Sequence, residues 1–167
     1  RHNMKKLILI RHAKSSWSLD VSDQDRPLTE KGIRKTEKIS IASKKIFFNA
    51  EVFYSSPANR ALHTASIIIN QLNLSFSNLY IEKDLYTFES SKLIKFIREI
   101  PNSFSNVICV GHNPAFTNAT NFLCDSNIEN LPTSSWAEIT FSQNSWTNIS
   151  KGVLKLGIPK IILKSDD

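Results

Sequence analysis

The chain has 167 residues, of which 41% are hydrophobic and 22% are charged, and its formal net charge at pH 7 is +6. This length and composition are typical of one globular domain that buries a real hydrophobic core. They exclude a membrane-spanning helix, because no apolar run approaches the roughly 18–20 residues that cross a bilayer.

Short apolar strands alternate with helical patterns along most of the chain. Thr29 is predicted to cap the first helix and Ser56 the second, which then begins at Pro57. Toward the C-terminus we expect β-rich pieces, and segment 161–163 is either a last strand or an apolar cover. This alternation favours an α/β fold whose largely parallel sheet is covered on both faces. The predicted strands lie at 5–10, 51–54, 79–82, 106–110, 136–141 and 146–154, and the predicted helices at about 29–47, from 57 onward, at about 93–100 and at about 114–123.

The sequence pattern also bears on domain number, location and partners. Residues 1–3 precede Met4 and are interpreted as the remnant of an expression tag, which leaves 4–167 as a single domain. No signal-peptide pattern follows Met4, so we expect a cytoplasmic monomer with no membrane partner. The lysines are dispersed and no recognition motif accompanies them, which argues against a nucleic-acid partner. Cys109 and Cys124 lack the spacing of a metal site, and two cysteines are too few for a disulfide framework.

Three of the predicted strand ends carry polar residues that are unusual in combination. Arg11 and His12 follow the first strand, Arg60 lies in the first turn of the helix after the second strand, and His112 follows the fourth strand. Ligands bind beyond the carboxyl ends of the strands in such sheets, so we expect these side chains to converge. Each of them alone has an ordinary interpretation as a hydrogen-bonded or solvated side chain. Their joint occurrence at matching strand ends favours a functional site.

Two histidines and two arginines are suited to phosphate chemistry. Guanidinium groups match phosphate oxygens in bidentate geometry, and the helix N-termini after the second and fourth strands offer further amides to an anion. The position of Arg60 supports this, since a cation near a helix N-terminus is unfavourable unless an anion faces it. A neutral His12 could attack phosphorus, while Arg11, Arg60 and a protonated His112 hold the phosphoryl oxygens. No set of four ligands for a closed metal site is evident, and we expect neither a metal nor a cofactor.

These residues lie in motifs that resemble those of the histidine phosphatase superfamily, which has a phosphoglycerate mutase-like fold. The stretch LILIRHAKS at 7–15 resembles the family's strand and Arg-His-Gly signature, with Ala13 in place of glycine as in the short bacterial branch. Three further segments resemble family motifs in the same order. Residues 25–32 resemble the segment that follows the signature, residues 55–65 resemble the Ser-Pro-x-x-Arg-Ala-x-x-Thr-Ala motif, and residues 110–114 resemble the second-histidine motif. The resemblance spans about 5–123, and SixA-like phosphohistidine phosphatases are the most similar branch.

The resemblance implies a three-layer α/β/α sandwich with a mostly parallel central sheet, and a metal-independent phosphatase. It also implies that His12 is the phosphorylated nucleophile and that Arg11, Arg60 and His112 bind the phosphoryl group. The segments between the motifs are too short to hold the insertions that cover the substrate of a mutase, so a mutase is the least favoured activity.

The general acid is the part of the site that the motifs do not define. Larger members of the family have a glutamate after the third strand, and Asp84 is its nearest counterpart here. Asp84 could equally be a surface carboxylate, and the loop aspartates Asp20, Asp23 and Asp25 are alternatives.

Two features of the polar loop at 15–27, which follows the first strand, have their own interpretations. Asp25 and Arg26, before Pro27, are expected to form a local ion pair that fixes the loop rather than to contact substrate. Trp17 either flanks the mouth of the pocket or packs on the helix of its own loop.

We therefore hypothesise that the partner is a phosphorylated protein or a small phosphate ester. Hydrolysis of protein phosphohistidine is favoured, because its imidazole leaving group needs less help from an acid than an alkoxide does. The alternatives are a phosphatase of small esters, such as sugar phosphates or nucleotides, and a non-catalytic module that binds phosphorylated ligands.

Overall fold

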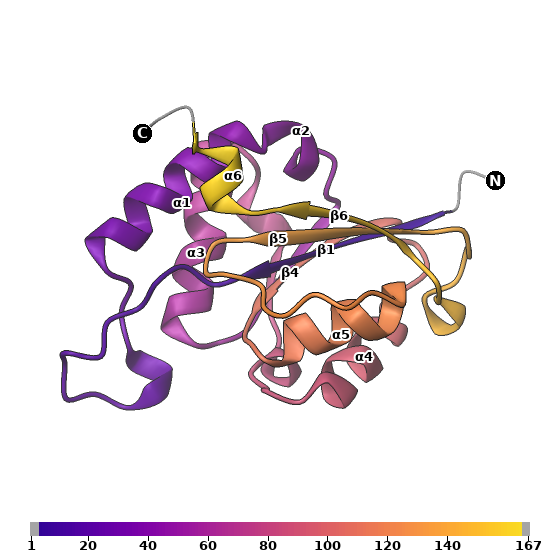
Figure 1. The fold of residues 1–167 in the computed structure, drawn as a ribbon, viewed down its shortest axis with the longest axis horizontal. Helices are drawn as coiled ribbons and strands as arrows, with labels where there is room; N and C mark the ends of the chain where they lie inside the picture. Colours follow the sequence, from indigo (N-terminus) through magenta and orange to yellow (C-terminus); the bar gives the residue numbers. More distant parts are fainter. Residues whose placement is uncertain (1–3, 165–167) are drawn as a thin grey trace.

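The computed structural model describes residues 4–164 (Figure 1). Residues 1–3, interpreted above as a tag remnant, and residues 165–167 lie outside the described residues. The centre of the molecule is a six-stranded sheet with the strand order β3-β2-β4-β1-β5-β6. The strands are β1 (Lys5–Arg11), β2 (Val52–Ser55), β3 (Leu79–Ile81), β4 (Asn106–Gly111), β5 (Trp136–Phe141) and β6 (Val153–Gly157).

Most of the sheet is parallel. The pairs β1–β4, β2–β4 and β2–β3 are parallel, whereas β5 runs antiparallel to both β1 and β6. Helices cover both faces (Figure 1). The prediction of a three-layer α/β/α sandwich with a mostly parallel sheet is therefore confirmed. One face carries α1 (Glu30–Ala42), α2 (Lys44–Phe47), α3 (Asn59–Gln71) and α6 (Pro159–Ile162), and the other carries α4 (Ser90–Arg98) and α5 (Ala115–Cys124).

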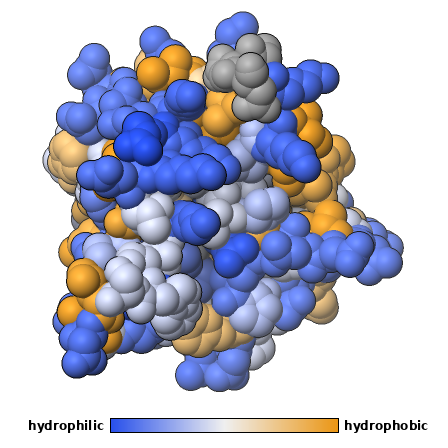
Figure 2. Space-filling model, turned by 60° about the vertical axis from the view of Figure 1, so that its left-hand side comes forward, coloured by the Kyte–Doolittle hydropathy of each residue, from blue (hydrophilic) through white to orange (hydrophobic). Residues whose placement is uncertain are grey.

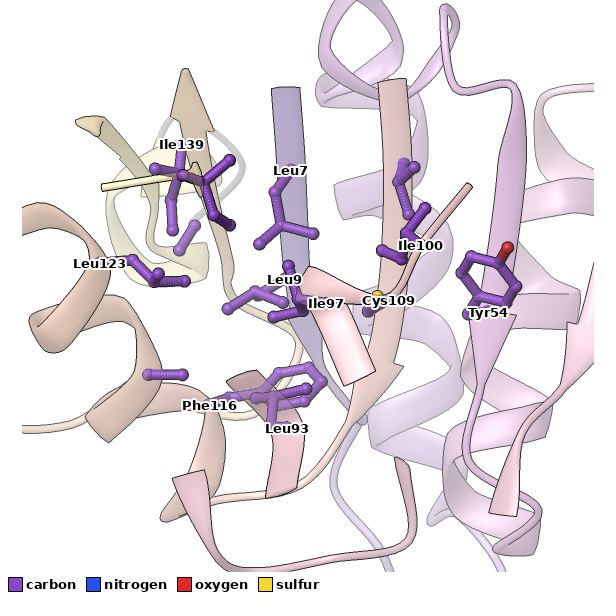
Figure 3. Packing of buried hydrophobic residues seen from close by; sticks show 14 of the residues in the cluster. Leu7, Leu9, Tyr54, Leu93, Ile97, Ile100, Cys109, Phe116, Leu123 and Ile139 are labelled. Carbon is purple, nitrogen blue, oxygen red and sulfur yellow. The ribbon is translucent and has the colours of Figure 1, made fainter. Parts of the chain in front are cut away.

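Each face of the sheet has its own hydrophobic core, because neighbouring residues of a strand point to opposite sides. In β1, Leu7 and Leu9 pack under α4 and α5 (Figure 3), whereas Ile8 and Ile10 pack under α1 and α3. These four side chains are at most 2% exposed. Burial of each such side chain contributes about 1.5–3 kcal/mol, so the two cores hold β1 firmly at the middle of the sheet.

The predicted helix at about 29–47 is two helices, with a break at Ser43. Thr29 caps α1 as expected, since its Oγ1 accepts a hydrogen bond from the Gly32 amide at 2.9 Å. Ser43 also has a tertiary partner at this break: the hydroxyl of the buried residue accepts a hydrogen bond from Trp136 Nε1, on β5, at 2.9 Å. A local pattern of apolar residues could not reveal this partner, which is 93 residues away.

The predicted cap at Ser56 is wrong. Helix α3 begins at Asn59, with Ala58 as its N-cap, so Pro57 lies before the helix. The hydroxyl of Ser56 instead accepts a hydrogen bond from the Ala58 amide at 3.1 Å and lies 2.8 Å from His112 Nε2. The side chain predicted to cap the helix therefore contacts a residue that follows β4, far away in the sequence.

The C-terminal elements also differ from the prediction. Residues 146–148 form a short 3₁₀ helix, and the last strand is β6, at Val153–Gly157, instead of 146–154. Segment 161–163 is not a strand: α6 occupies Pro159–Ile162, and Ile162 and Leu163 pack on the core beneath α1 and α3. The alternative of an apolar cover is the correct one. No helix among residues 4–164 is both long enough and apolar enough to span a membrane.

Replacing Ser43 with alanine is expected to destabilise the fold. The substitution leaves the buried indole N–H of Trp136 without its acceptor, and such a loss costs about 1–3 kcal/mol. Urea denaturation of Ser43→Ala should show this decrease in the free energy of unfolding, while Ser142→Ala, at an exposed position, serves as the control. An unchanged midpoint for Ser43→Ala would contradict the role assigned to this hydrogen bond.

Candidate active site

A cavity of about 380 Å³ opens at the carboxyl ends of the parallel strands. All four side chains that the sequence singled out line it: Arg11, His12, Arg60 and His112. The topology explains this convergence. Strand β1 pairs with β4 so that Arg11 lies opposite Gly111, and the two histidines therefore leave the sheet side by side. Their ring centroids are 5.3 Å apart.

His12 is held in one orientation by a hydrogen bond to the main chain. Its Nδ1 lies 2.7 Å from the carbonyl oxygen of Ala13. A carbonyl oxygen can only accept, so Nδ1 carries the proton and Nε2 keeps its lone pair. Arg60 Nε donates a hydrogen bond to this Nε2 at 3.3 Å. The nitrogen that can act as a nucleophile therefore faces a guanidinium group. A phosphoryl group bound to that guanidinium would lie next to the nitrogen that attacks it.

The pKa of His12 is lowered from 6.5 to about 4. Burial is the largest cause, because it disfavours the charged imidazolium. The hydrogen bond to Ala13 opposes the shift, while the positive charges of Arg60, Arg11 and Arg26 add to it. The imidazole is neutral at pH 7 for this reason, and only the neutral ring has a lone pair on Nε2.

His112 is also buried and also neutral. Its Nε2 lies 2.8 Å from Ser56 Oγ, and its Nδ1 is a buried nitrogen with no hydrogen-bond partner in the described part of the chain. Burial, followed by the effects of His12 and Arg60, lowers its pKa to about 3, although Asp23 opposes the shift. His112 is therefore neutral in the protein without a bound anion, whereas the predicted protonated His112 belongs to the site with a phosphoryl group bound. An anion bound beside Nδ1 would favour the protonated ring, because an opposite charge raises the pKa of a histidine.

Three arginines contribute positive charge to the cavity. Arg60 is 1% exposed and Arg26 is 7% exposed, and both line the cavity together with Arg11. Arg11 donates from Nη1 to the Leu131 carbonyl oxygen at 2.8 Å, while its buried Nε has no partner among residues 4–164. The unpartnered nitrogens of Arg11 and His112 are both donors or potential donors, which suits a phosphate better than a cation.

Asp23 joins two of these arginines. Its Oδ2 accepts from Arg60 Nη2 at 3.0 Å, its Oδ1 accepts from Arg26 Nε at 3.2 Å, and Tyr86 donates its hydroxyl hydrogen to Oδ2. Partial burial raises the pKa of Asp23, but the hydrogen bonds from Tyr86 and Arg60 and the charge of Arg60 outweigh burial and bring the pKa to about 2. The carboxylate is ionised at pH 7 and orients the two guanidinium groups.

The structure distinguishes among the candidate aspartates. Asp84 is exposed, on the 3₁₀ helix Lys83–Leu85, and does not line the cavity. Asp20 and Asp25 are exposed as well, and Asp25 accepts a hydrogen bond from Ser22. Of these four side chains, Asp23 alone lines the cavity in the part of the chain that the structure describes.

Two predictions about the loop need correction or completion. Arg26 pairs with Asp23 and not with Asp25. Asp23 lies three residues before Arg26, and one turn of the 3₁₀ helix Asp23–Asp25 places the two side chains on the same side. Trp17 lines the cavity and covers Arg26, with the guanidinium carbon 3.4 Å from the ring centroid. The ring is 78% exposed, so Trp17 lies at the mouth, the first of the two alternatives.

Sequence reasoning missed several side chains of the site. Arg26 and Ser56 were assigned local roles, and neither Tyr86 nor Phe88 was singled out. The aromatic ring of Phe88 lies 5.6 Å from that of His112 and lines the cavity. Both aromatic residues follow the third strand, so their position at a strand end was the available signal.

The N-terminus of α5 has fewer free amides to offer an anion than expected. At the start of α5, the amides of Phe116 and Thr117 already donate to the His112 carbonyl oxygen and to Asn113 Oδ1. Among residues 4–164, no group of three His, Cys, Asp or Glu side chains is arranged to hold a metal ion. The lining of the cavity, with three guanidinium and two imidazole groups, suits an anion.

Comparisons with known proteins agree with this chemistry. A family model described as "Histidine phosphatase superfamily (branch 1)" matches residues 7–105. The chain belongs to this superfamily. Membership supports phosphatase activity, although some relatives are mutases.

Individual relatives differ in what they share with the chain. An uncharacterized chloroplastic protein of Arabidopsis thaliana is 26% identical over 85% of this chain and 69% of its own length. A 2,3-bisphosphoglycerate-dependent phosphoglycerate mutase of Bacteroides thetaiotaomicron is 33% identical, but the match covers 44% of this chain and 31% of the mutase. The solved structure of a protein histidine phosphatase, SixA, with tungstate has a TM-score of 0.78 at 20% identity, and the match covers 94% of this chain and 99% of that one. At this identity, the likeness to SixA shows the fold.

Acid is expected to destabilise the protein between about pH 6.5 and pH 4. In the unfolded chain His12 and His112 bind protons near pH 6.5, whereas in the fold they stay neutral down to about 4 and about 3. The unfolded state thus binds more protons in this range, so the free energy of unfolding decreases as the pH falls. Stability from ionised Asp23 is lost only at lower pH, toward its pKa of about 2.

Urea denaturation at a series of pH values measures this dependence. Replacing His12 with glutamine should reduce the slope between pH 6.5 and 4, and inorganic phosphate should reduce the loss of stability of the unchanged protein. A slope that is the same in His12→Gln and in the unchanged protein would contradict the assigned pKa of His12.

Proposed function

We propose that this protein hydrolyses phosphohistidine on a partner protein through a covalent phosphohistidine on His12. The observation that carries the proposal is the state of His12: a neutral imidazole, anchored at Nδ1 by the Ala13 carbonyl, with its Nε2 lone pair in a cavity lined by three arginines. A side chain that only bound phosphate would gain from a proton, whereas a nucleophile must lack one.

The first step transfers the phosphoryl group to the enzyme. Arg11, Arg60 and Arg26 hold its oxygens and stabilise the charge of the transition state. His12 Nε2 forms a bond to phosphorus as the bond between phosphorus and the substrate's imidazole nitrogen breaks. The substrate's imidazole carries a proton on its other nitrogen, so it takes the electron pair of the broken bond and leaves as a neutral ring without a further proton.

The second step restores the enzyme. A water molecule attacks phosphorus, the bond to His12 Nε2 breaks, and inorganic phosphate leaves the cavity. His12 then again carries a proton on Nδ1 and none on Nε2, as the Ala13 carbonyl requires. The carbonyl thus favours the same tautomer at the start and at the end of the cycle.

The state of Asp23 favours phosphohistidine over an ester as substrate. With its pKa at about 2, Asp23 has no proton to give at pH 7, and Asp84 does not line the cavity. An alkoxide leaving group depends on a general acid, which contributes typically 10²–10⁴-fold to such reactions. An imidazole that is protonated on its other nitrogen leaves as a neutral ring, a far weaker base than an alkoxide, and needs less assistance. A site whose aspartates supply no proton is therefore better matched to a phosphorus–nitrogen bond.

The mouth of the cavity fits a side chain presented by a protein. Trp17 is 78% exposed and Phe88 is 49% exposed, and both rings line the cavity. Aromatic rings at the rim can stack on an imidazole that enters between them. An open rim also leaves space for the backbone of a partner.

Hydrolysis of a small phosphate ester is the second candidate. The relationship to phosphoglycerate mutases favours it, because those relatives act on small phosphorylated molecules. Lys14 also lines the cavity and could contact a second anionic group of such a substrate. A non-catalytic phosphate-binding module is the least favoured candidate, since its histidine would need no lone pair.

Replacing His12 with alanine is expected to abolish turnover and labelling. The unchanged protein should hydrolyse a generic aryl phosphate and, when quenched in denaturant, retain an acid-labile phosphoryl group on His12. His63→Ala is the matched control, because His63 lies on the same helix as Arg60 but does not line the cavity. If the unchanged protein neither turns over any phosphorylated substrate nor becomes labelled, catalysis through His12 is wrong.

Replacing Asp84 and Asp23 with asparagine separately tests the assignment of the acid. Asp84→Asn should leave the kcat of both an aryl phosphate and a phosphohistidine carrier protein within about twofold, since the residue is outside the cavity. Asp23→Asn should reduce both by about 10²-fold, because it releases Arg60 and Arg26 from their orientation. A selective loss of ester hydrolysis in Asp84→Asn would show instead that Asp84 is the general acid.

A further inference from the structure

A small hollow lined by lysines adjoins the catalytic cavity. It has a volume of about 80 Å³, and its walls include Lys14, Lys31, Lys35 and Thr133. Lys14 and Thr133 also line the catalytic cavity, so the two spaces share a wall. A molecule bound at His12 could therefore continue from the cavity into this hollow.

A longer groove continues from the hollow along α1. Its volume is about 410 Å³, it shares Lys31 and Lys35 with the hollow, and it reaches Lys160 on α6. No carboxylate lines either space in the described part of the chain. We call the six cations of the two spaces the basic track: Lys14, Lys31, Arg34, Lys35, Lys38 and Lys160.

The basic track does not serve the stability of α1. Lys31 and Lys35 are four residues apart, as are Arg34 and Lys38, and like charges at this spacing destabilise a helix by roughly 0.2–0.5 kcal/mol per pair. Lys31 also lies in the first turn, where the helix dipole disfavours a cation. Among residues 4–164, Arg34 alone of the six has an ion-pair partner, Glu30 at 3.8 Å, and that carboxylate is 91% exposed.

We propose that the basic track is the docking surface for an acidic face of the phosphorylated partner protein, next to its phosphohistidine. This inference rests on the proposed function for the identity of the substrate. The track supplies unpaired positive charge on one side of the cavity, and an acidic surface would neutralise the repulsion within α1. Figure 2 shows hydrophilic side chains gathered over much of the face on this side of the molecule.

The lining of the track favours a protein over a nucleic acid. Nucleic acids without a paired strand bind through aromatic side chains that stack on bases as well as through cations. The residues between the cations are Gly32, Thr133, Ser134, Pro159 and Leu163, none of which is aromatic. Carboxylates of a folded partner require only the cations. Their long-range attraction would also raise the rate of association.

Charge reversal on α1 tests the proposal without loss of the fold. In the double variant Lys31→Glu, Lys35→Glu, the helix dipole favours the new carboxylate at position 31 in the first turn, and neither residue lines the catalytic cavity. The matched control is Lys44→Glu, Lys45→Glu on α2, which changes the net charge equally at exposed positions outside the track. Thermal denaturation should show that both variants remain folded, and both should hydrolyse an aryl phosphate at the rate of the unchanged protein.

The first measurement uses a fluorescently labelled poly-L-glutamate of about 20 residues, at low salt where the Debye length exceeds about 10 Å. The unchanged protein should bind it, the track variant should bind about tenfold or more weakly, and the control variant should change by much less. Absence of binding to the unchanged protein, or an equal loss in both variants, would overturn the proposal. Binding of a single-stranded oligonucleotide of the same charge, lost in the track variant and stronger than that of poly-L-glutamate, would overturn the choice of a protein partner.

The second measurement compares kcat/KM for an acidic phosphohistidine carrier protein with that for an aryl phosphate. The track variant should lose about tenfold or more on the carrier protein and nothing on the aryl phosphate, and the loss should shrink as salt screens the charges. An equal kcat/KM for the carrier in track and control variants would overturn the proposal. If the unchanged protein does not hydrolyse phosphohistidine on any carrier, the proposed function fails, while the binding of poly-L-glutamate still decides whether the track is an acidic docking surface.

Discussion

The parallel pairing of β1 with β4 determines where every reactive group of the site can lie. Arg11 is opposite Gly111 in this pairing, so the next residue of each strand is a histidine at the same edge of the sheet. Gly111 is needed there, because a Cβ at this position would lie 2.8 Å from the ring of Phe116. The apolar residues of β1 are buried on both faces, and a shift of register by one residue would move each of them out of the core it packs in and into the opposite one. The energy of the two cores therefore also fixes the distance between the two histidines.

The site concentrates positive charge around imidazoles that the fold keeps neutral. Three guanidinium groups and two buried histidines would repel one another strongly if both rings carried protons. Burial and these charges keep the rings neutral, and Asp23 offsets part of the positive charge by pairing with Arg60 and Arg26. An incoming phosphoryl group supplies the missing negative charge, so binding it relieves repulsion that the protein alone cannot remove.

The same electrostatics connects the site with its proposed substrate and partner. A carboxylate that is held ionised by two arginines orients them well but has no proton to give, which favours a leaving group that leaves without strong acid assistance. The cations of α1 extend the positive field beyond the cavity, along the proposed docking surface. The chemistry of the bond that breaks and the character of the surface next to it thus favour the same class of substrate, a phosphorylated side chain on an acidic protein.

The sequence by itself was sufficient for the order of the elements, the α/β class and the four side chains at the strand ends. These follow from local patterns: apolar runs form buried strands, and residues after parallel strands share one edge of the sheet. Tertiary structure decided the partners that lie far away in the chain. Ser56 contacts His112 instead of capping a helix, Ser43 accepts from Trp136 at the end of α1, and Asp23 rather than Asp84 reaches the cavity. Each of these outcomes depends on a contact across many residues, and a hydrogen bond to a distant partner leaves no periodic trace in the sequence around it.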